Sequence, residues 1–273
     1  TGRYAGGENP FPGGPGHWKE NCPLQRGKRR EKENPSSLTF TGVLRSGFRP
    51  PVRERKERGA AMSEKKKRIG IMGGTFDPIH IGHLILGETA YHQFHLDKVL
   101  FMPAGNPPHK RAREDRATDR QRVDMVRLAI SSNPHFSLSL EEMHQEGYTY
   151  TYRTLERLKE QNPNTDYYFI LGADSLYTFE EWREPGRILG ACTILVGTRN
   201  HTSDEKLDRV IRDLEEKYQG DIQKLESLNI DISSKMIRSW IEKGRSLAYY
   251  VPDQVIEYIQ KNNIYKDCDE DEV

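Results

Sequence analysis

Residues 70–83, GIMGGTFDPIHIGH, decide the fold of this 273-residue chain. Apolar residues run into the pair Gly73 and Gly74, a polar turn follows, and two histidines precede an amphipathic segment. This order predicts a strand, a tight turn and the start of a helix. Because glycine has no Cβ and the N–H groups of a helix start attract phosphate, we predict a nucleotide site at this junction.

From Met62 onward, short apolar runs alternate with segments of helical periodicity. Such alternation is typical of α/β proteins, and we expect one doubly wound, Rossmann-like parallel sheet over residues 62–266. The predicted strands are 68–72, 98–103, 136–140, 167–171 and 192–196, with a sixth within 224–232. The predicted helices are 84–94, 118–131, 151–161, 204–218, 234–243 and 252–262, the last with Pro252 in its first turn.

The two ends of the chain differ in composition from this domain. Residues 1–61 are rich in Gly, Pro, Arg and Lys, with 13 basic against 6 acidic side chains. Such a segment buries too little apolar surface to offset the entropy of ordering, so we expect a disordered extension. We interpret it as translated upstream sequence or an artefact of the gene assignment, not native coding sequence, with a basic nucleic-acid-binding arm as the alternative. Residues 267–273 form an acidic tail.

Overall composition limits the function classes. The net charge is +1, and outside the extension the chain is slightly acidic, which indicates no general affinity for nucleic acid. Neither a membrane-spanning apolar run nor a signal peptide is visible, so we expect a soluble, cytoplasmic protein without a membrane partner. The cysteines Cys22, Cys192 and Cys268 lack the spacing of a metal site, and Cys192 is predicted to be a buried strand thiol.

The element GGTFDPIHIGH, residues 73–83, resembles the motif of bacterial nicotinate-nucleotide adenylyltransferases. These belong to the nucleotidyltransferase superfamily, which is marked by His-x-Gly-His or Thr-x-Gly-His. An isolated pair of histidines at this spacing would more often be structural. Here His80 and His83 coincide with two glycines and a turn, and further matches follow in order. The resemblance implies transfer of the adenylyl group of ATP to nicotinate mononucleotide, giving nicotinate adenine dinucleotide and pyrophosphate.

Three later matches concern the mononucleotide. The loop PAGNPPHK resembles a family element that ends on Lys110, although a stiff surface loop would look the same. The helix start at Thr151 would hold the nicotinate carboxylate through its N–H groups. Arg153 stands where the family usually has Asp, so the role of that side chain is open. Trp182 would stack on the pyridine ring, with ordinary packing as the alternative.

Other matches concern ATP. The element ILGADSL resembles a family motif in which Gly172 permits close approach and Asp174 accepts hydrogen bonds from ribose hydroxyls. The element ISSKMIR resembles the family pattern Ile-Ser-Ser-Thr-x-Ile-Arg, with Lys235 in place of the usual Thr, and would form a second phosphate cradle. The resemblance thus assigns ATP binding to Gly73, Gly74, Thr75, Phe76, His80, His83, Gly172, Asp174, Arg199, Ser233, Ser234 and Arg238.

The implied reaction is in-line attack by the phosphate of the mononucleotide on the α-phosphate of ATP. Since the attacking phosphate is already an anion, catalysis reduces to alignment and to stabilisation of the departing charge. His80, His83 and Arg238 are the expected catalytic residues, and Mg²⁺ is expected to be carried by ATP rather than by a cage of protein carboxylates. We expect a monomer or homodimer.

Three rival functions follow from the same residues. Phosphopantetheine adenylyltransferase and the cytidylyltransferases share the superfamily motif but usually have Thr in place of His80. His80-Ile81-Gly82-His83 also spells a motif of class I aminoacyl-tRNA synthetases, yet the chain has no room for an anticodon-binding domain. A non-catalytic nucleotide sensor would not need both histidines and Arg238. The preference for an acid or an amide on the pyridine ring stays open.

Overall fold

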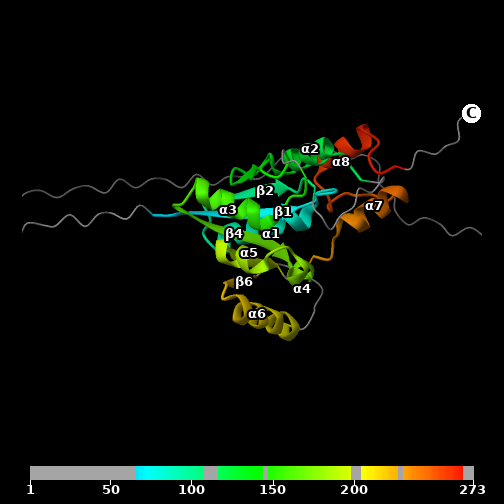
Figure 1. Cartoon of the computed structure of the whole chain (residues 1–273). Coiled ribbons are helices and arrows are strands. Elements are labelled where there is room, and N and C mark those ends of the chain that lie inside the picture. Colours follow the sequence, from blue (N-terminus) through cyan, green and yellow to red (C-terminus); the bar gives the residue numbers. More distant parts are fainter. Residues whose placement is uncertain (1–64, 107–115, 144–146, 198–203, 227–229, 267–273) are drawn as a thin grey trace, which may run out of the picture. The chain divides into compact units, whose positions relative to one another are not determined.

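The computed structural model describes residues 65–106, 116–143, 147–197, 204–226 and 230–266 (Figure 1). The chain divides into two compact units, residues 1–60 and 61–273, and every described residue belongs to the second. Among the predicted site residues, Lys110 and Arg199 lie outside the described residues, as do the predicted extension and acidic tail.

Strands and helices alternate along the second unit. In chain order they are β1 (Lys67–Gly74), α1 (Ile81–Gln93), β2 (Lys98–Pro103), α2 (Asp119–Ile130), β3 (Phe136–Leu138), α3 (Thr151–Gln161), β4 (Thr165–Gly172), α4 (Ala173–Tyr177), the 3₁₀ helix η1 (Phe179–Glu181), α5 (Pro185–Ala191), β5 (Thr193–Gly197), α6 (Asp204–Tyr218), β6 (Ile222–Leu225), α7 (Ser234–Glu242) and α8 (Asp253–Lys261).

The six strands form one sheet in the order β3-β2-β1-β4-β5-β6, and every neighbouring pair is parallel. This confirms the predicted doubly wound sheet. The order of the strands reverses between β1 and β4, and in such sheets ligands bind at the carboxyl ends of the strands beside this reversal. The pair Gly73 and Gly74 ends β1 at that point.

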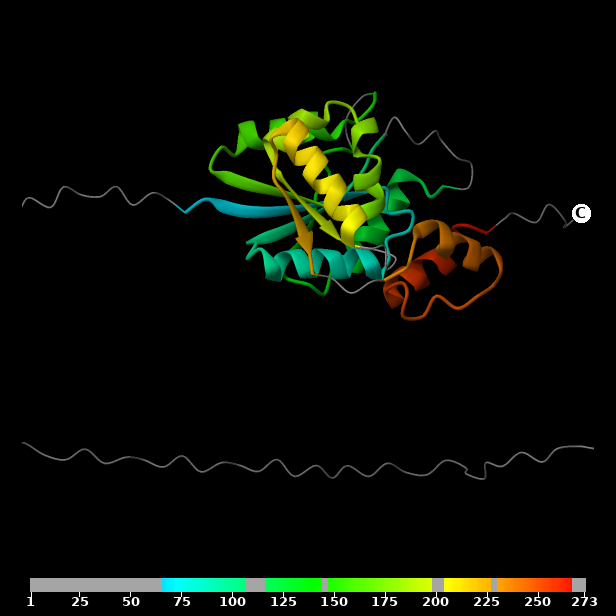
Figure 2. The same ribbon diagram turned by 90° about the horizontal axis from the view of Figure 1, so that it is seen from below.

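Helices cover both faces of the sheet (Figures 1 and 2). Successive residues of a strand point to opposite faces, so Ile71 packs with the buried residues of α3 to α6, whereas Met72 packs with those of α1, α2, α7 and α8. In Figure 2, α7 and α8 (orange to red) lie together near the N-terminal end of α1. A hydrogen bond of 2.9 Å from the N–H of Ile81 to the carbonyl of Tyr250 joins these segments.

Several predicted bounds were wrong. The strand β6 begins at Ile222, two residues before the predicted range, because Ile222 pairs with Ile194 of β5. Strand β3 ends at Leu138, and α1 begins at Ile81 rather than at residue 84, so His83 lies inside the helix. Pro252 precedes α8 as its N-cap rather than occupying its first turn.

Two further corrections concern the segment between β4 and β5. The helices α4, η1 and α5 were not predicted, because elements of 5, 3 and 7 residues are too short to show a helical period. Cys192 is buried as predicted, but it is the C-cap of α5 and precedes β5. Within the described ranges, none of the helices is both long and apolar enough to cross a bilayer.

Candidate active site

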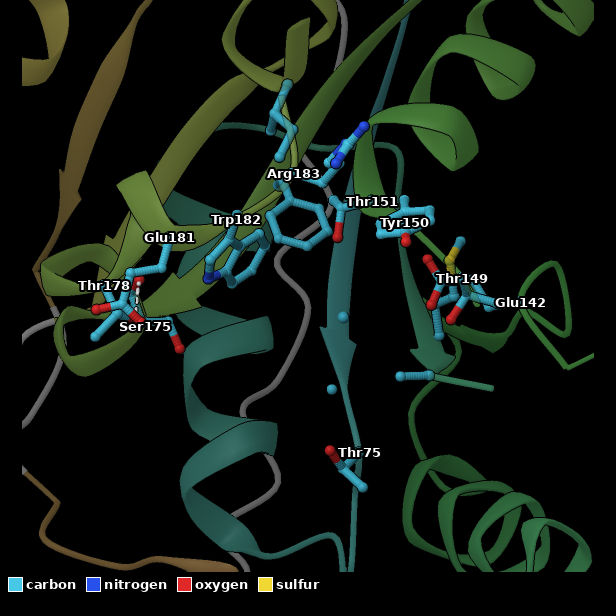
Figure 3. A pocket seen from close by; sticks show the side chains of 16 residues that line it. Thr75, Glu142, Thr149, Tyr150, Thr151, Ser175, Thr178, Glu181, Trp182 and Arg183 are labelled. Carbon is cyan, nitrogen blue, oxygen red and sulfur yellow. Dashed lines mark hydrogen bonds between the residues drawn. The ribbon is translucent and has the colours of Figure 1, made fainter. Parts of the chain in front are cut away.

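A cavity of about 370 Å³ lies at the carboxyl ends of β1, β2 and β4 (Figure 3). Its walls come from the end of β1, the start of α3 and the segment from α4 to α5. Five predicted site residues line it, namely Gly73, Gly74, Thr75, Thr151 and Trp182. The cavity therefore joins the glycine turn with both described residues that were predicted to bind the mononucleotide.

Close packing against aromatic rings favours glycine at the end of β1. A Cβ on Gly73 would lie 2.9 Å from Cζ of Phe169, whose ring lines the cavity. A Cβ on Gly74 would lie 3.1 Å from the ring of Phe76. Phe76 has φ of 51°, in the left-handed region that costs a non-glycine residue about 1 kcal/mol or more, and its ring is only 1% exposed. Burial of this ring offsets the strain and holds the turn in place.

Trp182 follows η1 and is partly buried at the cavity wall. Its ring meets Phe169 edge-on, with centroids 6.2 Å apart and an interplanar angle of 85°, and packs on Phe179 at 5.5 Å. Figure 3 shows Trp182 facing the cavity, with Tyr150 and Thr151 on the opposite side. An aromatic ring held from behind in this way is a suitable surface for a flat ligand ring.

The start of α3 forms the opposite wall. Tyr150 is the N-cap and makes no side-chain cap, so the first turn presents its N–H groups and its positive dipole end to this side. Arg153 turns to the neighbouring tyrosines: its guanidinium lies 5.5 Å from the ring of Tyr150 and 5.7 Å from that of Tyr152, and its Nε donates to the Tyr152 hydroxyl at 2.9 Å. Arg153 does not belong to the described lining of the cavity.

Sequence reasoning missed Glu142 and Thr149, which line the same wall (Figure 3). Burial raises the pKa of Glu142, while its hydrogen bond to Thr154 and the charge of Arg157 act in the opposite direction. Thr149 is 5% exposed, and its hydroxyl makes no hydrogen bond among the described residues. For Thr149, two residues before Thr151, the available signal was its place at the entry to the helix, whereas the sequence around Glu142 gave no such signal.

The histidine pair lies beyond the glycine turn, at the start of α1. His80 is the N-cap and is 1% exposed. Its backbone N–H donates to Nδ1 of His83 at 3.2 Å, and the two rings stack with centroids 3.8 Å apart. The ring of Phe76 meets that of His83 edge-on at 5.0 Å. Phe76 therefore supports His83 as well as the turn.

The second phosphate motif contacts the same turn from the other end of the chain. Nη1 of Arg238 donates to the carbonyl of Asp77 at 2.6 Å and lies 3.8 Å from its Oδ2. The hydroxyl of Ser234 donates to the carbonyl of Pro78 at 2.9 Å. Ser233 caps α7 by accepting the N–H of Met236 at 3.2 Å. The structure thus brings together two motifs that were predicted to act together.

Tyr265 and Arg122, which were not singled out from the sequence, hold the turn and the second phosphate motif in this arrangement. Oδ1 of Asp77 accepts from the Tyr265 hydroxyl at 2.7 Å and from the N–H of Ala117 at 3.1 Å. Burial raises the pKa of Tyr265, and the charge of Asp77 raises it further. The fully buried Arg122 donates to the carbonyls of Thr75 and Ala104, at 2.7 and 2.8 Å. These contacts fix both ends of the glycine turn.

Other predicted ATP residues lie outside the cavity lining that the structure describes: Gly172, Asp174, Phe76, His80, His83, Ser233, Ser234 and Arg238. Gly172 ends β4 and is the N-cap of α4, and Asp174 is an exposed residue of α4 beside the lining residue Ser175. The site therefore has two parts, a cavity with an aromatic wall and a cluster of histidine, arginine and serine side chains around the turn.

Comparisons with known proteins show the family to which the chain belongs. A family model described as cytidylyltransferase-like matches residues 71–239. A protein of Lachnoclostridium phytofermentans named "Probable nicotinate-nucleotide adenylyltransferase" is 41% identical over 199 residues, which are 73% of this chain and 99% of that protein. The chain belongs to the nicotinate-nucleotide adenylyltransferase family.

The match to this adenylyltransferase family extends over whole relatives. A protein of Thermoanaerobacter sp. with the same name is 40% identical over 212 residues, 77% of this chain and 100% of that protein. Among solved structures, nicotinic acid mononucleotide adenylyltransferase of Plasmodium falciparum complexed with APC has a TM-score of 0.58 and 23% identity. That structural match covers 73% of this chain and 97% of the other, and it shows a shared adenylyltransferase fold.

Proposed function

We propose that this protein transfers the adenylyl group of ATP to nicotinate mononucleotide, forming nicotinate adenine dinucleotide and pyrophosphate in NAD biosynthesis. One observation carries the proposal. The histidine turn and the ISSKMIR element are joined by the bond from Arg238 to Asp77, next to a cavity walled by Trp182 and the start of α3. The proteins of similar sequence that are named for this reaction support it.

The cavity suits the mononucleotide. Stacking on Trp182 places the pyridine ring between this side chain and the start of α3. A carboxylate on the ring is then favoured by the N–H groups and the positive dipole end near Thr151. An uncharged amide would gain less from the same helix end, so we propose that the acid is the better substrate. Lys110 stays a prediction.

The cluster around the turn suits the triphosphate. A phosphate oxygen of the mononucleotide forms a bond to the α-phosphorus of ATP, the bond from this phosphorus to the bridging oxygen breaks, and pyrophosphate leaves with that oxygen. We propose that His80, His83 and Arg238 stabilise the negative charge on the departing group. Removal of one such donor typically costs about 10²–10³ in kcat. Asp174 is proposed to accept hydrogen bonds from the ribose of ATP.

Magnesium enters this proposal as part of the substrate. Among the described residues, no group of three His, Cys, Asp or Glu side chains is placed to hold a metal ion. The ATP phosphates themselves bind Mg²⁺, which usually keeps several water ligands in such sites. The cytoplasmic location and the monomeric or homodimeric state stay predictions from the sequence.

A coupled assay of pyrophosphate release tests the proposed function. Purified protein is supplied with MgATP and, in turn, with nicotinate mononucleotide, nicotinamide mononucleotide or phosphopantetheine. We expect the highest kcat/KM with nicotinate mononucleotide. Faster release with phosphopantetheine would show that the rival adenylyltransferase activity is correct. Binding of ATP without release from any of the three would favour a nucleotide sensor.

A further inference from the structure

Arg183 is the one positively charged side chain among the described residues that line the main cavity. It follows directly on Trp182, and the acidic members of the same lining are Glu142 and Glu181. Arg183 is exposed, and within the described ranges its guanidinium makes no hydrogen bond or ion pair. The cavity therefore offers five N–H donors and a full positive charge to an anionic group of a ligand.

Two neighbouring arginines are engaged by the protein instead. Arg187 of α5 donates to the two carboxylate oxygens of Glu156, at 2.7 and 2.6 Å, and Arg153 donates to the Tyr152 hydroxyl. Neither arginine belongs to the described lining of the cavity. Of these three arginines, Arg183 is therefore the one that faces the space for a ligand.

The backbone directly after Arg183 forms an unusual turn. Glu184 has φ of 56° and ψ of 57°, in the left-handed region, and Pro185 follows as the first residue of α5. This region is unfavourable for a residue with a Cβ and is found where the surrounding packing enforces it. The N–H groups of Arg187 and Ile188 donate to the Glu184 carbonyl at 3.0 and 3.3 Å, and Ile188 is fully buried. The packing of α5 thus fixes the point at which the Arg183 side chain leaves the backbone.

The Arg183 side chain extends toward the start of α3. Figure 3 shows it reaching from the wall that carries Trp182 toward Thr151 on the other side of the cavity. A contact between the helices holds these walls together, since the Arg187 guanidinium lies 4.4 Å from the centre of the Tyr152 ring. An anionic group at the start of α3 would therefore lie between the N–H groups of this helix and the Arg183 guanidinium.

We propose that Arg183 determines the preference for an acid over an amide on the pyridine ring, by pairing with the ring carboxylate. This inference rests on the proposed function and names the side chain that sets its substrate preference. The parallel N–H donors of a guanidinium match the two oxygens of a carboxylate. A carboxamide has one oxygen and no charge, and its NH₂ group opposes donors with donors. The full charge of Arg183 adds to the partial charge of the helix dipole.

Steady-state kinetics with two mononucleotides test this pairing. We expect Arg183→Gln to lower kcat/KM for nicotinate mononucleotide by about 5- to 20-fold, mainly through KM, as loss of a charged hydrogen bond in a partly solvated pair implies. For nicotinamide mononucleotide, kcat/KM should change by less than about 2-fold, because the amide has no charge to pair. Arg183→Lys keeps the charge but loses the parallel donors, so its effect should be intermediate.

Arg187→Gln is the matched control. It removes the same charge from the same segment, but from a guanidinium that Glu156 engages outside the described cavity lining. Its acid-to-amide ratio of kcat/KM should stay within about 2-fold of the wild-type ratio, since the charge is exposed and distant from the ring. Because Arg183 is exposed, thermal unfolding of Arg183→Gln should match that of the wild type.

Three results would overturn the role of Arg183. An equal loss with both mononucleotides would show that the guanidinium acts on the phosphate or ribose that the two share, or on the fold. An unchanged acid-to-amide ratio in Arg183→Gln would show that the backbone alone sets the preference. An equal shift of this ratio in Arg187→Gln would show a general effect of charge.

Equilibrium binding separates this inference from the proposed function. Calorimetric titration with each mononucleotide in the absence of ATP needs no turnover. A wild-type protein that binds the acid more tightly than Arg183→Gln does, yet releases no pyrophosphate from ATP, would refute the adenylyl transfer and retain the role of Arg183. Pyrophosphate release with an acid preference that survives in Arg183→Gln would refute the role of Arg183 and leave the proposed function standing.

Discussion

The backbone N–H of His80 donates to Nδ1 of His83 across 3.2 Å, while the two imidazole rings stack at 3.8 Å. A ring nitrogen that accepts a hydrogen bond carries no proton, so neutral His83 holds its proton on Nε2. The start of α1 therefore selects the tautomer of His83 and orients its ring. This tautomer is the one that can donate from Nε2 to a phosphate oxygen.

Replacement of His83 tests this role. We expect His83→Ala to lower kcat by about 10²–10³ with modest changes in both KM values, because a donor to the departing charge is lost. His83→Asn is the matched variant: its amide can accept from the N–H of His80, but it does not extend to the position of Nε2. Both variants should be slow, and only the alanine variant should lose helix-start stability. A near-normal kcat in either variant would contradict the assignment.

Replacement of Trp182 should weaken the binding of one substrate only. We expect Trp182→Ala to raise the KM for nicotinate mononucleotide by about 3- to 10-fold, as loss of an aromatic contact of about 0.5–1.5 kcal/mol implies. The KM for ATP should change little. Trp182→Phe retains a flat ring and should recover most of the affinity. Steady-state kinetics with each substrate varied in turn measure this, and equal effects on both substrates would count against stacking.

Arg122 should stabilise the folded protein. Its side chain is fully buried and donates to the carbonyls of Thr75 and Ala104 and to Asp119. We expect Arg122→Met to lower the free energy of unfolding by about 1–3 kcal/mol for each of the two carbonyls that lose this donor, whereas Asp119 is exposed to water. The neighbouring Arg120 is 93% exposed and 4.0 Å from Asp124, so Arg120→Met should change the same quantity by less than about 1 kcal/mol. Urea unfolding compares them, and similar losses would refute the argument.

Glu142 should make stability depend on pH. Burial raises its pKa, so the folded protein favours the neutral acid, whereas the unfolded chain ionises near the ordinary value of about 4.3. As the pH rises through and above this value, ionisation therefore costs folded stability. Glutamine does not ionise and can keep a hydrogen bond to Thr154. The unfolding free energy of Glu142→Gln relative to wild type should thus increase from about pH 3.5 to pH 7, and a constant difference would contradict the raised pKa.

Helices and strands whose signal lies in residues close together in the sequence were predictable. The bounds predicted for β2, α3 and α6 coincide with the observed ones, because a long apolar period or a buried run identifies such elements locally. The short helices between β4 and β5 lacked this signal. Likewise, the two phosphate motifs were expected to act together only through a resemblance, and the bond from Arg238 to Asp77 was not predicted, since the two residues are 161 positions apart.

The amino-acid order alone determined the parallel sheet, the glycine turn and the helix starts that attract phosphate, because these follow from local periodicity and from the absence of a Cβ at Gly73 and Gly74. Only the tertiary structure decided which charged groups become buried and what they meet. Glu142, Arg122 and Arg116 look like ordinary surface residues in the sequence. Their desolvation, and hence their chemistry, arises from segments that folding brings against them from distant positions.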